Sequence, residues 1–108
     1  MRITVVQTKS IHDKAKNIAQ ALDLMTRAVE TDRPDVLVLP EVWNWRGGTT
    51  ATKIANADRI PGGEAYEAIQ AFARTHKVWV HGGSMIELIP GGSQVYNTTC
   101  VFDRSGTA

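Results

Sequence analysis

A run of four consecutive apolar residues, Val36 to Leu39, constrains the fold of this chain more than any other feature. Its apolar residues follow one another without alternation, which is typical of a strand buried on both faces of a helix-covered parallel sheet. Pro40 and Glu41 end the run abruptly, and proline has no amide hydrogen with which to continue strand pairing. We therefore predict an α/β fold with this strand inside the sheet.

The flanking segments predict the partners of this strand, because their apolar residues repeat with either the helical or the strand period. The predicted order is strand, helix, strand, helix, strand, strand, over residues 3–6, 13–31, 36–39, 64–77, 78–89 and 95–102. Strands joined through helices are most simply parallel, whereas the last two, joined by a tight turn, are most simply an antiparallel hairpin. This order predicts a mixed sheet with flanking helices. Residues 42–63 are predicted to form a long, irregular loop.

Charge and composition argue against several classes of protein. Twelve basic and eleven acidic side chains leave a net charge of +1, so no electrostatic attraction to nucleic acid or to an anionic membrane is expected. No apolar run approaches the roughly 20 residues that cross a bilayer. The single cysteine, Cys100, has no partner for an internal disulfide, which favours a reducing compartment. Because the N-terminal residues lack the features of a signal peptide, we expect a cytoplasmic protein.

Glu41 is the strongest candidate for a catalytic residue. It follows a buried strand at the point where a long loop begins, and ligands of α/β proteins bind beyond the carboxyl ends of the strands. Trp43 and Trp45 are candidates for an apolar pocket wall beside it, and a carboxylate in such surroundings is suited to general-base catalysis. The alternatives are a solvated strand-end acid or an ion-pair partner for Glu41, and core packing for the tryptophans.

The remaining residues are weaker candidates for a functional site. His81 lies beside a glycine pair and is a candidate pocket residue, although a hydrogen-bonded structural histidine is the simpler interpretation. The three histidines lack metal-ligand spacing, and neither a phosphate-binding loop nor a serine-hydrolase elbow is present. We therefore expect no metal and no cofactor. Cys100 lies in an alternating, strand-like run without an elbow, which indicates a small apolar filler rather than a nucleophile.

The stretch from Val36 to Trp43, with Pro40 and Glu41 at its centre, resembles the glutamate motif of the nitrilase superfamily of carbon–nitrogen hydrolases. Further segments are similar to that family in the same order, at residues 3–7, 60–63, 82–84, 96–97 and 102–106. Each similarity is weak alone, but the ordered set covers essentially the whole chain.

The resemblance implies a fold, a reaction and a set of catalytic residues. The fold is a four-layer α-β-β-α sandwich, and the reaction is hydrolysis of a non-peptide carbon–nitrogen bond through a Cys-Glu-Lys triad. Glu41 matches the glutamate, the lysine is expected soon after the turn that starts at Asp103, and the cysteine is expected later still. Neither of these two positions lies within the 108 residues. We therefore expect residues 1–108 to be the N-terminal part of a single, incomplete hydrolase domain that is inactive alone.

The resemblance also implies a small-molecule amide or nitrile substrate, for which a small linear amide is preferred, and assembly as a homo-oligomer. A different class of function stays open. The chain can instead be a non-catalytic α/β module that binds through the loop from Val42 to Gly63, or a truncated product without activity. A lysine and then a cysteine at an elbow, encoded beyond Ala108, would favour the enzyme.

Overall fold

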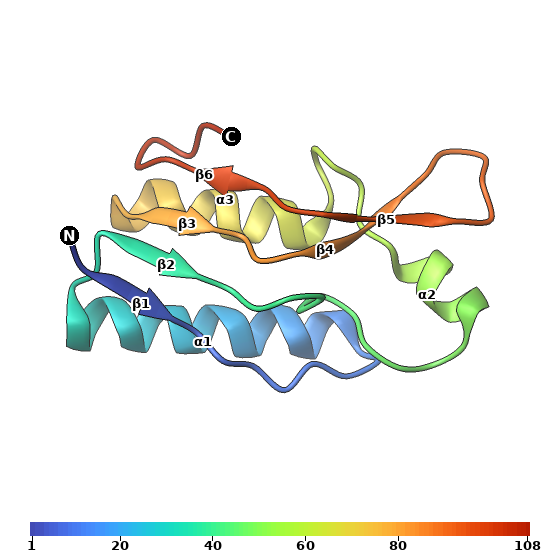
Figure 1. Ribbon diagram of the computed structural model, residues 1–108, viewed down its shortest axis with the longest axis horizontal. Coiled ribbons are helices and arrows are strands. Elements are labelled where there is room, and N and C mark those ends of the chain that lie inside the picture. Colours follow the sequence, from blue (N-terminus) through green and yellow to red (C-terminus); the bar gives the residue numbers. More distant parts are fainter.

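The structure, a computed structural model, describes all of residues 1–108. Three helices and six strands follow one another along the chain (Figure 1): β1 (Ile3–Val5), α1 (Lys14–Asp32), β2 (Val36–Val38), α2 (Thr50–Asn56), α3 (Glu64–His76), β3 (Trp79–His81), β4 (Met85–Leu88), β5 (Val95–Thr98) and β6 (Val101–Phe102). None of the three helices has the length and apolarity that crossing a bilayer requires.

The strand β2 lies inside a four-stranded sheet of order β1-β2-β3-β6, as predicted. The predicted burial of both its faces is wrong, because Leu37 is buried on the helix-covered face whereas Val36 and Val38 are only half-buried. Its neighbours β1 and β3 are parallel to it, and Leu37 pairs with Thr4 on one side and Val80 on the other. The short strand β6 is antiparallel to β3, so the sheet is mixed. A second, two-stranded antiparallel sheet is formed by β4 and β5.

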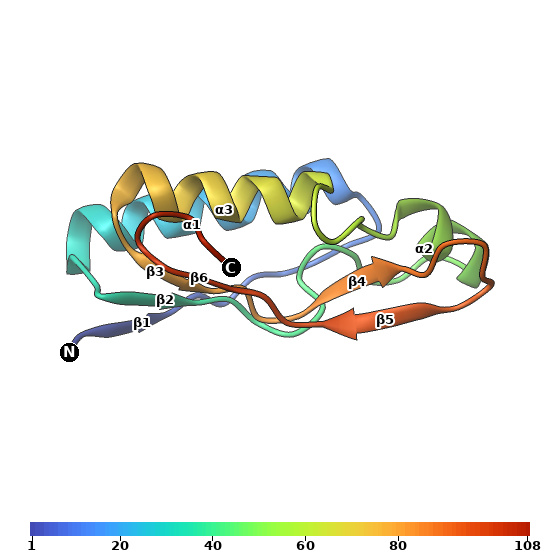
Figure 2. The same cartoon turned by 90° about the horizontal axis from the view of Figure 1, so that it is seen from above.

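One face of the four-stranded sheet is covered by helices and the other face is not. The helices α1 and α3 lie side by side on the same face (Figure 2), where they enclose the core with the sheet. Fully buried side chains from both layers meet there, among them Met25, Leu37, Ile69, Val80 and Phe102. The opposite face exposes large apolar side chains of three strands, namely Ile3, Val5, Trp79 and Val101. The chain thus has one helical layer and one sheet layer.

The first helix begins and ends for local reasons. Asp13 is its N-cap, and the carboxylate accepts a hydrogen bond from the Lys16 amide at 3.1 Å, which satisfies one of the free donors of the first turn. Arg33 ends the helix in the left-handed conformation, and its amide donates to the Val29 carbonyl. Because Pro34 follows, the chain cannot continue as a helix and turns into β2. The predicted bounds are confirmed to within one residue.

Two features of the loops and strands differ from the prediction. The loop of residues 42–63 contains the helix α2, which starts with a capping box between Thr49 and Thr52. No residue of α2 is buried, so its sequence has no apolar stripe from which a helix could be predicted.

The predicted continuous strands 78–89 and 95–102 are each divided in two. Gly82 and Gly83 interrupt the first, and Gly83 has a φ of +57°, which extended strands do not contain. Cys100 lies in the second break, and its carbonyl accepts the Gly82 amide at 2.8 Å. The two breaks therefore face one another and direct β4 and β5 away from the main sheet.

Candidate functional site

Glu41 lies beyond the carboxyl end of β2, two residues after the buried Leu39. Its side chain is exposed. The four ion pairs of the chain involve other residues, and no group of the chain donates a hydrogen bond to the Glu41 carboxylate. Within these 108 residues, Glu41 is therefore not a partner in an ion pair. The carboxylate is available to a bound molecule.

A cavity of about 370 Å³ opens beside Glu41, a volume in the range of small-molecule sites. Its walls come from the segment after β2, from α2 and from β4, and include Glu41, Val42, Trp45, Arg46, Lys53 and Ile86. One carboxylate and two cations thus border the same space. Neither cation forms an ion pair within the chain, so both are free to meet an anionic group.

The two tryptophans that follow Glu41 lie in different environments. Trp45 is 5% exposed and lines the cavity with Glu41. Its indole Nε1 is the one buried side-chain nitrogen or oxygen in the chain without a hydrogen-bond partner. Trp43 is 1% exposed, belongs to the core, and donates from Nε1 to the Gly82 carbonyl at 2.9 Å. The structure brings Trp45 to the cavity and places Trp43 in the core.

His81 is half-buried on β3 and does not line this cavity. Its Nδ1 accepts a hydrogen bond from the Gly83 amide at 3.2 Å, and its carbonyl accepts the Leu39 amide at 3.0 Å. These bonds agree with the simpler interpretation from sequence, in which His81 is a hydrogen-bonded structural histidine.

Arg46 and Lys53 are the cavity residues that sequence reasoning missed. Arg46 follows Trp45 directly, whereas Lys53 lines the cavity from α2. A helix with no buried face leaves no periodic signal, so only the position of Arg46 close to Glu41 could have been noticed in advance.

The segment that carries Glu41 is hydrogen-bonded to Ser84, which precedes β4, and to Ile86 within β4. The Val42 amide donates to the Ser84 hydroxyl at 2.8 Å, and the Ser84 amide donates to the Pro40 carbonyl at 3.2 Å. Asn44 is fully buried, and its side chain exchanges two hydrogen bonds with the backbone of Ile86. These contacts fix the start of the loop against the second sheet.

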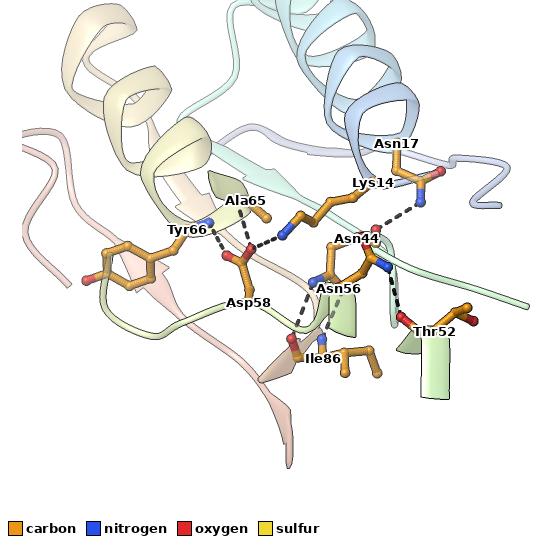
Figure 3. A network of polar contacts seen from close by, with 9 residues as sticks. All are labelled: Lys14, Asn17, Asn44, Thr52, Asn56, Asp58, Ala65, Tyr66 and Ile86. Atoms are coloured by element: carbon orange, nitrogen blue, oxygen red, sulfur yellow. Dashed lines mark hydrogen bonds and ion pairs between the residues drawn. The ribbon is translucent and has the colours of Figure 1, made fainter. Parts of the chain in front are cut away.

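Asp58 anchors the other end of the loop (Figure 3). Its side chain is fully buried and accepts hydrogen bonds from the amides of Ala65 and Tyr66, at the start of α3, at 3.3 and 2.9 Å. The ammonium group of Lys14, from α1, lies 3.2 Å from the same carboxylate. The Asp58 backbone also bonds to β4, where its amide donates to Ile86. One aspartate therefore joins both core helices to the second sheet.

Cys100 is not placed for nucleophilic chemistry. Burial raises the pKa of its thiol, and the nearby carboxylate of Glu87 raises that pKa further. Both effects oppose the thiolate form that reacts. No group of three or more His, Cys, Asp or Glu side chains is arranged to hold a metal ion.

Comparison with known proteins places these observations in a family. Residues 2–108 match the model of the carbon–nitrogen hydrolase family. The chain is 32% identical over 105 residues to a hydrolase of Schizosaccharomyces pombe, covering 97% of this chain and 32% of that protein. It is 35% identical over 80 residues to the 2-oxoglutaramate amidase of Bacillus subtilis, covering 71% of this chain and 28% of that protein.

Solved structures agree with these matches. The NitFhit protein of C. elegans superposes with a TM-score of 0.86 at 27% identity, covering 97% of this chain and 25% of that one. Nit3 of Saccharomyces cerevisiae, a member of branch 10 of the nitrilase superfamily, gives a TM-score of 0.85 at 24% identity, covering 99% and 41%. The chain spans less than a third of the length of the curated relatives that it matches. By its sequence over residues 2–108 and by its fold, this chain belongs to the carbon–nitrogen hydrolase family.

Proposed function

We propose that this chain provides the general base of an enzyme that hydrolyses a small linear amide, and that Glu41 is that base. The observation that carries the proposal is the position of Glu41. Its carboxylate follows the central strand, borders a cavity of about 370 Å³ and has no partner within the chain. The nucleophilic cysteine and the lysine of the family triad are then supplied by residues outside these 108.

The proposed reaction uses Glu41 twice. It accepts the proton of the cysteine thiol as the sulfur attacks the amide carbon, and the lysine cation stabilises the negative oxygen that forms. Glu41 then gives the proton to the departing nitrogen, which leaves as ammonia. In the second half, Glu41 takes a proton from the water that attacks the thioester, and the thiol regains a proton as the acid is released.

Ammonia release from a panel of compounds tests this proposal. The protein that contains residues 1–108, expressed from its whole reading frame, is assayed with a linear amide, a carbamoyl compound and a nitrile of similar size. We expect ammonia from the amide at the highest kcat/KM. The absence of ammonia from every compound would contradict the proposal and favour a non-catalytic binding module.

The charges of the cavity support a narrower proposal for the substrate. Arg46 and Lys53 border the same cavity as Glu41 and form no ion pair in the chain. Cations in this position favour an amide that carries a carboxylate at its other end, because charge-assisted hydrogen bonds to a carboxylate are strong. The relative from Bacillus subtilis is named for such an amide, 2-oxoglutaramate.

We expect Arg46→Gln and Lys53→Gln to reduce the preference for the acidic amide. The measured quantity is the ratio of kcat/KM for glutaramate to that for its uncharged methyl ester. Each substitution removes one cation from the cavity, so the ratio should fall about tenfold, the equivalent of roughly 1.4 kcal/mol. Lys16→Gln, which removes an exposed cation of α1, is the matched control. A ratio that stays at the wild-type value in both cavity variants would remove Arg46 and Lys53 from substrate recognition.

A further inference from the structure

The direction of the Glu41 side chain depends on the backbone that carries it. The carboxylate has no ion-pair partner in the chain, and the side chain is exposed. Side-chain contacts of the kind that hold most catalytic acids in one orientation are therefore lacking here. A general base must nevertheless lie within hydrogen-bond reach of the proton that it takes. Within these 108 residues, the conformation of residues 40–43 sets the direction in which the side chain leaves the backbone.

The backbone next to Glu41 is in an unfavourable conformation. Val42 has a φ of +51°, which is the left-handed region. A β-branched residue there is a clear outlier, because its branched side chain crowds the backbone. Such conformations persist only where surrounding contacts impose them, and they gather at functional sites. The turn at Val42 also separates the directions of Glu41 and Trp43, since Glu41 borders the cavity and Trp43 enters the core.

Ser84 supplies the contacts that impose this conformation. Its hydroxyl accepts the Val42 amide at 2.8 Å, and its carbonyl accepts the Trp43 amide at 3.2 Å. Its own amide donates to the Pro40 carbonyl at 3.2 Å. Ser84 therefore holds the backbone on both sides of Glu41 and is itself 7% exposed.

Gly83 allows this close approach. A Cβ atom at position 83 would overlap the Pro40 carbonyl oxygen, and its φ of +57° also disfavours any larger residue. Gly83 lies in the break between β3 and β4, and at this break the chain brings Ser84 against the Glu41 segment.

We propose that Ser84 is a positioning residue for the reaction. Its hydroxyl holds Val42 in the left-handed conformation and so directs the Glu41 carboxylate into the cavity. This inference rests on the proposed function, and it concerns a residue that touches neither the cavity nor the reacting atoms.

Ser84→Ala is the first test, in the whole protein with its best amide substrate. The hydroxyl acceptor is lost and nothing replaces it, so Glu41 is no longer held in one direction. We expect kcat to fall about 10- to 100-fold, as misplacement of a catalytic group by about an ångström does, with a KM change of less than about threefold. Ser105→Ala, which removes a hydroxyl from the turn after β6, should leave both constants unchanged.

Val42→Gly separates positioning from general stability. Glycine adopts the left-handed conformation without strain, so Tm should be equal to or above that of the wild type. The backbone beside Glu41 is nevertheless freer to move, so kcat should fall by about tenfold or more. A purely structural role for this segment predicts that kcat and Tm change in the same direction.

The outcomes separate this inference from the proposed function. Loss of turnover in Glu41→Gln, together with a lower kcat and an undiminished Tm in Val42→Gly, supports both. Loss of turnover in Glu41→Gln with wild-type kcat in a folded Ser84→Ala or in Val42→Gly overturns the positioning role alone, as does a kcat that falls only with Tm. Full turnover in Glu41→Gln overturns the proposed function. If Ser84→Ala does not fold, Val42→Gly still decides the question.

Discussion

Glu41→Gln lowers kcat by about 10²- to 10⁴-fold in the active protein, the range by which general acid–base catalysis accelerates reactions. Glutamine has nearly the same size as glutamate and can still donate and accept hydrogen bonds, but it cannot take a proton from a thiol or from water. Because the Glu41 side chain is exposed, the free energy of unfolding should change by no more than about 0.5 kcal/mol. The measurement is steady-state ammonia release, beside a denaturant titration of both proteins.

Glu30→Gln is the matched control for this substitution. Glu30 is an exposed glutamate on α1, away from the cavity, and its replacement removes the same charge. Wild-type kcat in Glu30→Gln together with a large loss in Glu41→Gln assigns the effect to the position of the carboxylate. Equal kcat values for the two variants would remove Glu41 from catalysis.

Asp58→Ala has the largest expected effect on stability. The substitution leaves the Lys14 ammonium without its partner in a site where the lysine side chain is 16% exposed. It also leaves the Ala65 and Tyr66 amides at the start of α3 without an acceptor. Removing one partner of a buried ion pair costs about 3–5 kcal/mol. We expect a loss of that size in the free energy of unfolding, measured by urea denaturation of the protein.

A comparison of two lysines on the same helix isolates the ion-pair contribution. Lys14→Met removes the buried partner of Asp58, whereas Lys16→Met removes a lysine whose ion pair to Asp13 is 4.0 Å long and exposed. Exposed pairs contribute about 0–1 kcal/mol, so Lys16→Met should be nearly neutral. In Lys14→Met, the Asp58 carboxylate keeps its two amide donors but loses its counter-ion. A wild-type stability for Asp58→Ala would show that this aspartate does not join the two helices to β4.

Much of the main sheet can be predicted from sequence because its signals are local. Four apolar residues without alternation place β2 inside the sheet, and the three- and four-residue spacing of apolar side chains locates α1 together with its cap at Asp13. The position of Glu41 beyond the carboxyl end of β2 can be predicted for the same reason, since a polar residue at the end of a buried strand is a local pattern.

The elements that could not be predicted have no repeat of apolar residues in the sequence. The helix α2 buries no residue, so its start is set by Thr49 and Thr52 rather than by an apolar stripe. The break between β3 and β4 arises where Gly83 meets Pro40, more than forty positions earlier in the chain. Neither the start of α2 nor the break between β3 and β4 is marked by periodic apolar residues in the sequence.

The tryptophans show how local contacts can override the direction that residue spacing predicts. Trp43 and Trp45 follow the same strand at a spacing of two, which in an extended chain would place them on one face. Asn44, whose side chain is bonded to Ile86, lies between them, and Val42 turns the chain just before. The pair therefore divides between core and cavity, and only Trp45 borders the space beside Glu41.

A crystal structure of the Glu41→Gln protein with bound glutaramate shows whether the substrate binds beside residue 41. We expect the amide group within about 3.2 Å of the side chain of residue 41, the reach of a general base, with the carboxylate of the ligand toward Arg46 and Lys53. A ligand bound elsewhere, with residue 41 open to solvent, would contradict this expectation.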